Sequence, residues 1–328
     1  MSVEGGARAI VAALLANVGI AVTKLVAFLL TGSSSMLAES VHSLADSGNQ
    51  ALLLIGGKKS RRAATPAHPF GFGRERYVYA FVVSIVLFSV GGLFALYEAW
   101  HKLQHAEPIT GRWWWVPIAI LVIAMALEGF SFHTAVTESN HIRGERSWTA
   151  FIRTAKAPEL PVILLEDFAA LLGLMFAMFG VSMTLVTGNG IWDAVGTALI
   201  GTLLVCVAVV LSIEMKSLLV GEAATVDQQR AIRAALEGDR ESTVEGDQGL
   251  AVERVIHLRT LHLGPEELLV CAKLAVGRGD HAYQIAAAID AAEQRARESV
   301  PGLRLVIYLE PDIDRGASDP VSWQTATG

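Results

Sequence analysis

Three ionisable residues recur at helical spacing within residues 37–46. His42 and Asp46 are four residues apart, so on a helix they lie one above the other, and Glu39 joins the same stripe three residues before His42. The stretch opens an apolar run long enough to cross a bilayer, where ionisable side chains are costly to bury. The stripe therefore predicts a metal site, a proton path or a water-filled cavity.

A second pair of acids, Glu166 and Asp167, falls in another apolar run at a depth similar to that of His42 and Asp46. An imidazole with several carboxylates suits Zn²⁺ and also admits Mn²⁺ or Fe²⁺. A lone buried His or Asp can equally pair with a neighbouring helix or a water. For His42, Asp46 and Asp167 together we favour metal binding, because each unpaired charge costs at least about 2.5 kcal/mol in a membrane. Glu39 either supports a metal ligand from outside the site or lines the entry, and Glu166 either binds metal or pairs with a residue of another span; these alternatives stay open.

The elements that must position these residues are apolar runs. The chain is 52% hydrophobic and 18% charged, and its apolar excess ends near Leu211. A span needs about 20 apolar residues, and the runs that meet this length are approximately 8–30, 36–57, 77–100, 114–137, 161–186 and 191–213. We interpret the first run as a retained span, because further runs follow it and no clear cleavage site does. Asn17, Asn49, Gln50 and Glu128 are expected to form hydrogen bonds between these helices or to line a cavity.

Basic residues gather in two of the joints between these runs. The joint after the second run and the joint after the fourth run hold Lys58, Lys59, Arg61, Arg62, Arg74, Arg76 and Arg143, Arg146, Arg153, Lys156. Because Lys and Arg are retained on the cytoplasmic side, both termini are predicted to be cytoplasmic. We expect a multi-pass protein of a bacterial inner or plasma membrane.

The chain from Ser212 onward has the pattern of a soluble domain. Predicted elements are a helix at 226–236, strands at 252–263 and 267–276, a helix at 281–300 with Asp280 as N-cap candidate, and a strand at 303–309 closed by Pro311. The order α-β-β-α-β predicts an α+β, ferredoxin-like cytoplasmic domain with its helices on one face of a sheet. The expected division is a six-span transport domain at 1–213, a dimerisation or regulatory domain at 214–315 and a disordered tail at 316–328.

Composition argues against several other functions. The net charge is −6 without a basic tail, which makes nucleic acid a poor partner. Cys206 and Cys271 fall in different domains, so neither a disulfide framework nor a thiolate metal site is expected. His257 and His262 are five apart on a predicted strand and therefore face opposite sides. Whether either of them, or His281, binds a regulatory metal stays open.

Four segments of the sequence resemble the cation diffusion facilitators, also called zinc transporters. They are Gly32-Ser-Ser-Ser-Met-Leu-Ala-Glu-Ser-Val-His-Ser-Leu-Ala-Asp, His68-Pro-Phe-Gly-Phe-Gly-Arg-Glu-Arg-Tyr, Leu164-Leu-Glu-Asp-Phe-Ala-Ala-Leu-Leu-Gly and Leu218-Leu-Val-Gly-Glu-Ala-Ala. The Leu-Leu-Glu-Asp form is similar to the subgroup that includes animal zinc transporter nine. The resemblance covers the six predicted spans and the domain that follows them.

The resemblance implies a homodimer that exports a divalent metal, most readily Zn²⁺, in exchange for protons by alternating access. It implies no enzyme activity and no resident cofactor, since the ion is cargo. The implied metal ligands are His42, Asp46 and Asp167. The family's fourth ligand position is Ile163 here, which cannot bind metal, so Glu166, Glu39 or water are the candidates to replace it. The alternatives are the same transporter for Mn²⁺, Fe²⁺ or Co²⁺, and a metal sensor without transport; no His-Glu-x-x-His motif supports a metalloenzyme.

Overall fold

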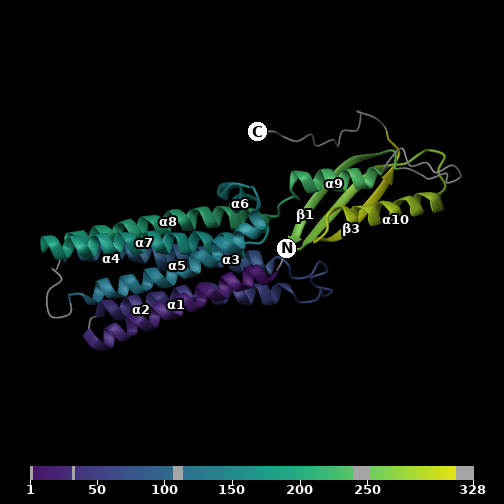
Figure 1. The fold of residues 1–328 in the computed structure, drawn as a ribbon. Helices are drawn as coiled ribbons and strands as arrows, with labels where there is room; N and C mark the ends of the chain where they lie inside the picture. The colour runs from purple at the N-terminus through teal and green to yellow at the C-terminus, as the bar shows by residue number, and fades with distance from the viewer. Residues whose placement is uncertain (1–2, 32–33, 106–113, 239–251, 315–328) are drawn as a thin grey trace. The chain divides into compact units, whose positions relative to one another are not determined.

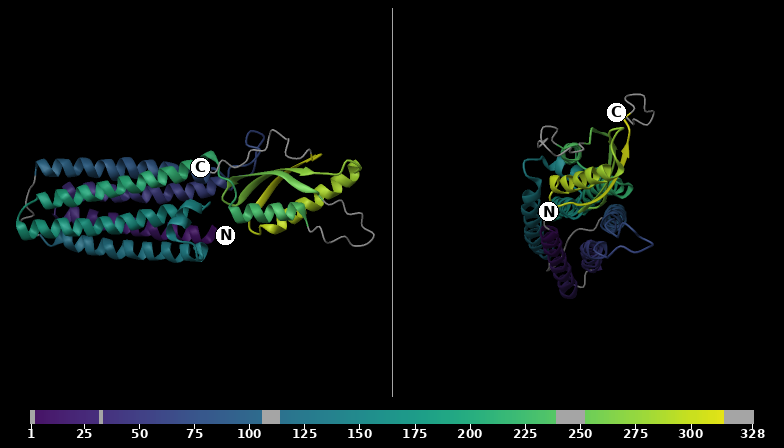
Figure 2. Two further views of the ribbon diagram at one scale, coloured as in Figure 1. Left: turned by 90° about the horizontal axis from the view of Figure 1, so that it is seen from above. Right: turned by 90° about the vertical axis from the view of Figure 1, so that its right-hand side faces the viewer.

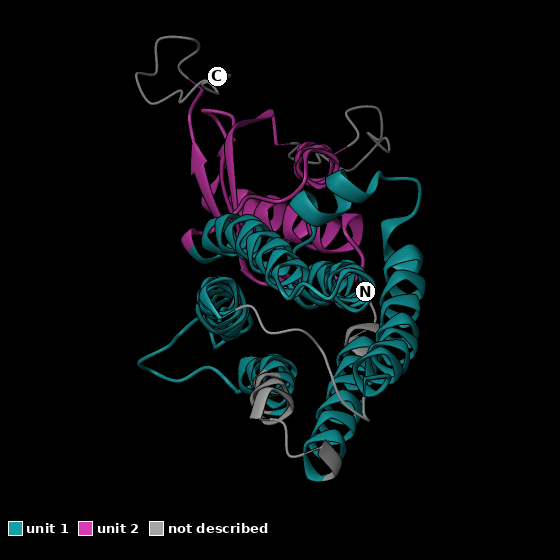
Figure 3. Cartoon of the chain, turned by 90° about the vertical axis from the view of Figure 1, so that its left-hand side faces the viewer, with its two compact units in different colours: residues 1–219 teal, residues 220–328 magenta. Residues whose placement is uncertain are grey.

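The computed structural model describes residues 3–31, 34–105, 114–238 and 252–314. In the first two helices the side chains of residues 3–6, 30, 31, 34–39, 41, 42 and 45 lie outside this description, and they include those of Glu39 and His42. The chain divides into two compact units, Met1–Leu219 and Val220–Gly328 (Figure 3). Each unit has a hydrophobic core of its own.

The first unit is helical. Its elements are α1 (Val3–Thr31), α2 (Ser34–Ser60), α3 (Glu75–Val86), the π-helical η1 (Leu87–Leu93), α4 (Phe94–Gln104), α5 (Val116–Arg143), α6 (Trp148–Thr154), α7 (Glu159–Thr187) and α8 (Ile191–Val220). The long helices run side by side as a bundle (Figure 1). α3, η1 and α4 follow one another without a break and together form the third predicted span.

Five helical segments within the described residues are long and apolar enough to cross a membrane. They are Ala7–Leu29, Glu75–Gln104, Val116–Arg143, Glu159–Thr187 and Ile191–Val220. These segments confirm a multi-pass membrane protein. α2 is 27 residues long but is not among the five, so the sixth span stays a prediction.

Glycines set the close approach of α8 to its neighbours. A Cβ on Gly180 of α7 would lie 2.8 Å from the carbonyl oxygen of Trp192, and one on Gly196 of α8 would lie 2.9 Å from that of Phe176. A Cβ on Gly92 would likewise lie 2.7 Å from the side chain of Val205. Small residues of this kind let membrane helices pack backbone against backbone.

The second unit is a small α+β domain. It contains α9 (Val226–Glu237), β1 (Arg254–Gly264), β2 (Glu267–Ala275), α10 (Ala282–Ser299) and β3 (Arg304–Asp312) in the predicted order. β2 is central, antiparallel to β1 and parallel to β3. Both helices lie on one face of this sheet (Figure 2), and inward side chains such as Leu268, Val270 and Leu274 form its core.

Two local predictions for this unit are wrong. β3 does not end before Pro311 but continues to Asp312, with Pro311 opposite Leu274. β3 is an edge of the described sheet, where a residue without an N–H can face away from its neighbour. Asp280 is not the N-cap of α10, because His281 takes that position while the Asp280 carboxylate accepts a hydrogen bond from the Gly277 N–H at 2.8 Å.

Candidate cation site in the helical bundle

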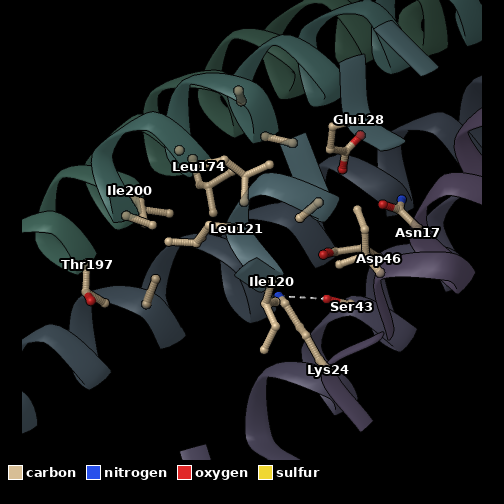
Figure 4. A pocket seen from close by; sticks show the side chains of 18 of the residues that line it. Asn17, Lys24, Ser43, Asp46, Ile120, Leu121, Glu128, Leu174, Thr197 and Ile200 are labelled. Atoms are coloured by element: carbon tan, nitrogen blue, oxygen red, sulfur yellow. Dashed lines mark hydrogen bonds between the residues drawn. The ribbon is translucent and has the colours of Figure 1, made fainter. Parts of the chain in front are cut away.

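A cavity of about 440 Å³ lies inside the first unit (Figure 4). Most of its wall is aliphatic, with side chains such as Ile120, Leu174 and Ile200. One group of polar lining residues comes from α1, α2, α5 and α7 and consists of Asn17, Lys24, Ser43, Asp46, Glu128, Glu166 and Asp167. Within this group, α2, α5 and α7 each contribute at least one carboxylate to the same cavity.

The neighbours Glu166 and Asp167 on α7 turn to different helices, because successive residues diverge by about 100° around the axis. Glu166 accepts hydrogen bonds from Asn49 Nδ2 at 2.9 Å and from Gln50 Nε2 at 3.0 Å, both on α2. Asp167 accepts one from Ser131 Oγ of α5 at 2.6 Å. The two carboxylates are almost completely buried, at 7% and 1% exposed. α7 is thus tied by its acids to both neighbouring helices.

The bonds to Glu166 continue into α1. Asn17 Nδ2 donates to Gln50 Oε1 at 3.2 Å, so one chain of hydrogen bonds joins α1, α2 and α7. This geometry confirms the expectation of interhelical bonds for Asn17, Asn49 and Gln50. Such bonds satisfy polar groups that neither lipid nor the aliphatic wall can satisfy.

Asp46 of α2 is partly buried and lines the cavity. Close by, Lys24 Nζ of α1 donates to Ser43 Oγ at 3.0 Å (Figure 4). His42 stands one helical turn before Asp46 on α2, and Glu39 precedes it on the same helix. The side chains of these two residues lie outside the described part of the chain, so their roles stay predictions.

Ile163 is fully buried in the apolar core of the bundle and offers no ligand atom. Glu128 of α5 lines the cavity instead, at 6% exposed, and its Oε2 has no hydrogen-bond partner among the described residues. The sequence placed Glu128 as cavity lining but not among the candidate ligands. An acid in the middle of an apolar run was the signal that could have found it. Ser131 carried no comparable signal, because hydroxyls in membrane helices commonly bond to their own backbone.

No group of three or more His, Cys, Asp or Glu side chains closes around a common point within the described residues, a set without the His42 and Glu39 side chains. The three histidines of the second unit do not gather either, as far as the described residues go. His262 is buried, with its Nδ1 3.3 Å from the Gly264 carbonyl oxygen, whereas His281 is exposed. The ligand assignments therefore stay predictions.

Charged residues also stand at two other positions in the bundle. Lys102 of α4 lies 3.3 Å from Glu98 and 3.0 Å from Asp193 of α8, and all three line the cavity. Asp193 is in the first turn of α8. Arg76 of α3 pairs with the buried Glu159 of α7. The Lys102–Asp193 and Arg76–Glu159 pairs join helices that are far apart in sequence, whereas Lys102 and Glu98 are both on α4.

Comparison with known proteins assigns the helical unit to a family. The family model described as "Cation efflux transmembrane domain" matches residues 10–220. The mitochondrial proton-coupled zinc antiporter SLC30A9 of Xenopus laevis is 33% identical over 242 residues, which is 73% of this chain and 43% of the relative. The human SLC30A9 antiporter is 34% identical over 218 residues, 66% of this chain and 38% of the relative.

Metal tolerance protein C4 of Arabidopsis thaliana is 30% identical over 220 residues, which is 66% of this chain and 47% of that protein. The chain thus spans less than half the length of these relatives. The matched residues contain every helix from which the cavity is built. The chain belongs to the cation efflux family, as its resemblance to the cation diffusion facilitators indicated.

Proposed function

We propose that this protein exports a divalent metal cation, Zn²⁺ in the first place, in exchange for protons. The observation that carries the proposal is the cavity to which α2, α5 and α7 contribute carboxylates, those of α5 and α7 buried. Uncompensated acids at membrane depth are costly, and a bound cation removes that cost. The zinc antiporters among the relatives support Zn²⁺ as the ion.

In the proposed site His42, Asp46 and Asp167 hold the ion. Ser131 donates to Asp167 Oδ2 and so fixes the direction in which the other oxygen of this carboxylate points. Outer hydrogen bonds of this kind commonly orient metal ligands. Glu166 has each of its oxygens occupied by an amide donor, from Asn49 and Gln50, so it serves to join α2 to α7. The ion is the substrate, and we propose no resident cofactor.

Proton exchange is proposed to depend on His42. Histidine is the side chain whose unperturbed pKa lies closest to physiological pH, and an imidazole must lose its proton to bind a metal. Metal entering from the cytoplasm therefore displaces a proton, and protonation on the far side releases the metal. Movement of the helices between two arrangements exposes the site to each side in turn.

The proposed architecture is a homodimer with six spans and cytoplasmic termini in a bacterial inner or plasma membrane. α2 is the sixth span, supported by its 27-residue length and by the hydrogen bonds of its middle to α1 and α7. At about 1.5 Å per residue this helix is long enough to cross a bilayer. The second unit is proposed to be a ferredoxin-like cytoplasmic domain that dimerises, supported by its α-β-β-α-β order.

Uptake of a panel of divalent ions into proteoliposomes, with and without a pH gradient, tests this function. We expect Zn²⁺ flux that rises with the gradient, and loss of flux in His42→Ala and Asp46→Ala although both variants still insert. Faster flux of Mn²⁺, Fe²⁺ or Co²⁺ would identify that ion as the substrate in place of Zn²⁺. Metal binding without flux of any ion would identify a sensor and refute transport.

A further inference from the structure

We propose that Glu128 of α5 is a direct ligand of the transported cation. It would be the fourth ligand, a role that Ile163 cannot perform. This inference rests on the proposed function, since it concerns the same cavity. It adds a third helix, α5, to the ligand sources predicted on α2 and α7, and it gives the ion an oxygen ligand that the sequence did not identify.

The Glu128 carboxylate is buried and only partly satisfied by the described residues. The residue is 94% buried, lines the cavity, and leaves Oε2 without a hydrogen-bond partner within the described chain. A buried carboxylate oxygen without a donor is unfavourable, because it has lost its water and gained nothing in return. A cation in the cavity would supply the missing interaction.

Glu128 also lies close to the other acids of the cavity. Its carboxylate lies within electrostatic range of Asp167, Glu166 and Asp46. Figure 4 shows Glu128 and Asp46 projecting into the same space from α5 and α2. Like charges that share one cavity repel one another, whereas a divalent cation among them attracts each carboxylate.

The other described candidates for the fourth ligand fit the role less well. Ile163 has no donor atom and is packed in the apolar core. Each oxygen of Glu166 already accepts an amide hydrogen bond, which holds this carboxylate toward α2 and uses part of its lone-pair capacity. Glu128 Oε2 accepts no hydrogen bond from the described residues, so its full capacity is left for a cation.

Lys24 offers an alternative explanation for Glu128. Lys24 lines the same cavity and donates to Ser43, so Glu128 could serve only to balance its charge. The two explanations differ in what they predict. A balancing charge affects the stability of the protein, whereas a ligand affects the affinity for the ion.

The test measures binding of Zn²⁺ to the full-length, detergent-solubilised protein by titration calorimetry, with thermal unfolding and proteoliposome flux alongside. Glu128→Gln keeps the size of the side chain and removes its charge. We expect its dissociation constant for Zn²⁺ to rise on the order of tenfold or more. Glu138→Gln is the matched control, since Glu138 is on the same helix, lies outside the cavity lining and pairs with Arg8 at 3.9 Å; its affinity should equal that of the wild type.

A Glu128→Gln variant with unchanged affinity and lower thermal stability would overturn the proposal in favour of charge balance with Lys24. If Glu128→Gln does not fold, Glu128→Asp decides, because it keeps the charge and withdraws the carboxylate by one methylene. Weaker Zn²⁺ binding by a folded Glu128→Asp supports a ligand, and unchanged binding refutes it. Failure of the proposed function looks different, since the wild type itself would then show no metal flux.

Glu128 also predicts the selectivity of the site. A third carboxylate beside Asp46 and Asp167 makes the ligand set richer in oxygen, which favours harder ions such as Mn²⁺ relative to a site with two imidazoles. Glu128→His should therefore raise the ratio of Zn²⁺ to Mn²⁺ affinity in the same titrations. A ratio that does not move would contradict direct ligation by this residue.

Discussion

Ser131 and Ser139 are buried hydroxyls on the same helix, and they differ in what they contact. Ser131 Oγ donates to Asp167 Oδ2 at 2.6 Å, whereas Ser139 Oγ has no partner among the described residues. A side chain that orients a metal ligand commonly affects affinity when it is removed. Replacing each serine in turn therefore distinguishes an effect on metal binding from the general effect of losing a buried hydroxyl.

We expect Ser131→Ala to weaken Zn²⁺ binding on the order of tenfold, because Asp167 loses the donor that fixes its orientation. Ser139→Ala, the control, should bind Zn²⁺ as tightly as the wild type. Titration calorimetry on the two solubilised variants measures both values. Equal affinities for the two variants would mean that Ser131 plays no part in positioning Asp167.

At the scale of helices, packing of α7 against α8 depends on Gly180. A Cβ at this position would lie 2.8 Å from the backbone carbonyl of Trp192, which cannot move aside as a flexible side chain can. We expect Gly180→Ala to destabilise the protein by roughly 1–3 kcal/mol. Gly129→Ala on α5 is the control, since a Cβ there meets nothing within 4 Å and alanine favours a helix. Thermal unfolding in detergent should show a lower midpoint for Gly180→Ala alone.

The two interhelical ion pairs differ in burial and should differ in energy. Arg76 and Glu159, which join α3 to α7, have side chains 13% and 5% exposed, whereas Lys102 and Asp193 are 25% and 31% exposed. Arg76→Met leaves a buried carboxylate without its partner and should cost about 3–5 kcal/mol of stability. Lys102→Met should cost less than about 1 kcal/mol, because water screens its partners. A larger loss from Lys102→Met than from Arg76→Met, in the same unfolding assay, would contradict this ranking.

Elements that depend on sequence periodicity were predictable. The apolar runs marked the five helices that are long and apolar enough to cross a membrane, and the α-β-β-α-β order followed from the helix and strand patterns of the chain after Ser212. The π-helical segment Leu87–Leu93 and the short helix α6 were not predicted. Both depend on local packing and capping, such as Ser147 Oγ accepting from the Ala150 N–H at 3.2 Å, rather than on a repeated pattern.

The candidate site was predictable in part for the same reason. Helical spacing put Asp46 forward, and position within an apolar run put Glu166 and Asp167 forward; all three line the cavity. The sequence pattern could not show that the Glu166 carboxylate accepts hydrogen bonds from Asn49 and Gln50. Nor could it show that Glu128 lies near the other acids of the cavity. Those facts depend on which helices are neighbours, and one sequence contains no direct record of that.

At the scale of the whole molecule, the charge distribution along the chain divides the joints into two classes. The segment between α2 and α3 is rich in Lys and Arg, whereas the tight turn between α7 and α8 has none. Because basic residues are retained in the cytoplasm, these two joints should lie on opposite sides of the membrane. Exposed positions are available in both, namely Phe70 in the first and Thr187 beside the second.

Single cysteines at these positions give a direct measure of orientation. In a background with Cys206→Ala and Cys271→Ser, we expect a membrane-impermeant maleimide to label Phe70→Cys in inside-out vesicles and Thr187→Cys in right-side-out vesicles. The native Cys271, restored in the same background, should label with Phe70→Cys, since the second unit is proposed to be cytoplasmic. Labelling of Phe70→Cys from the outside would reverse the proposed direction of export, because the same cavity would then take up its cation from the opposite compartment.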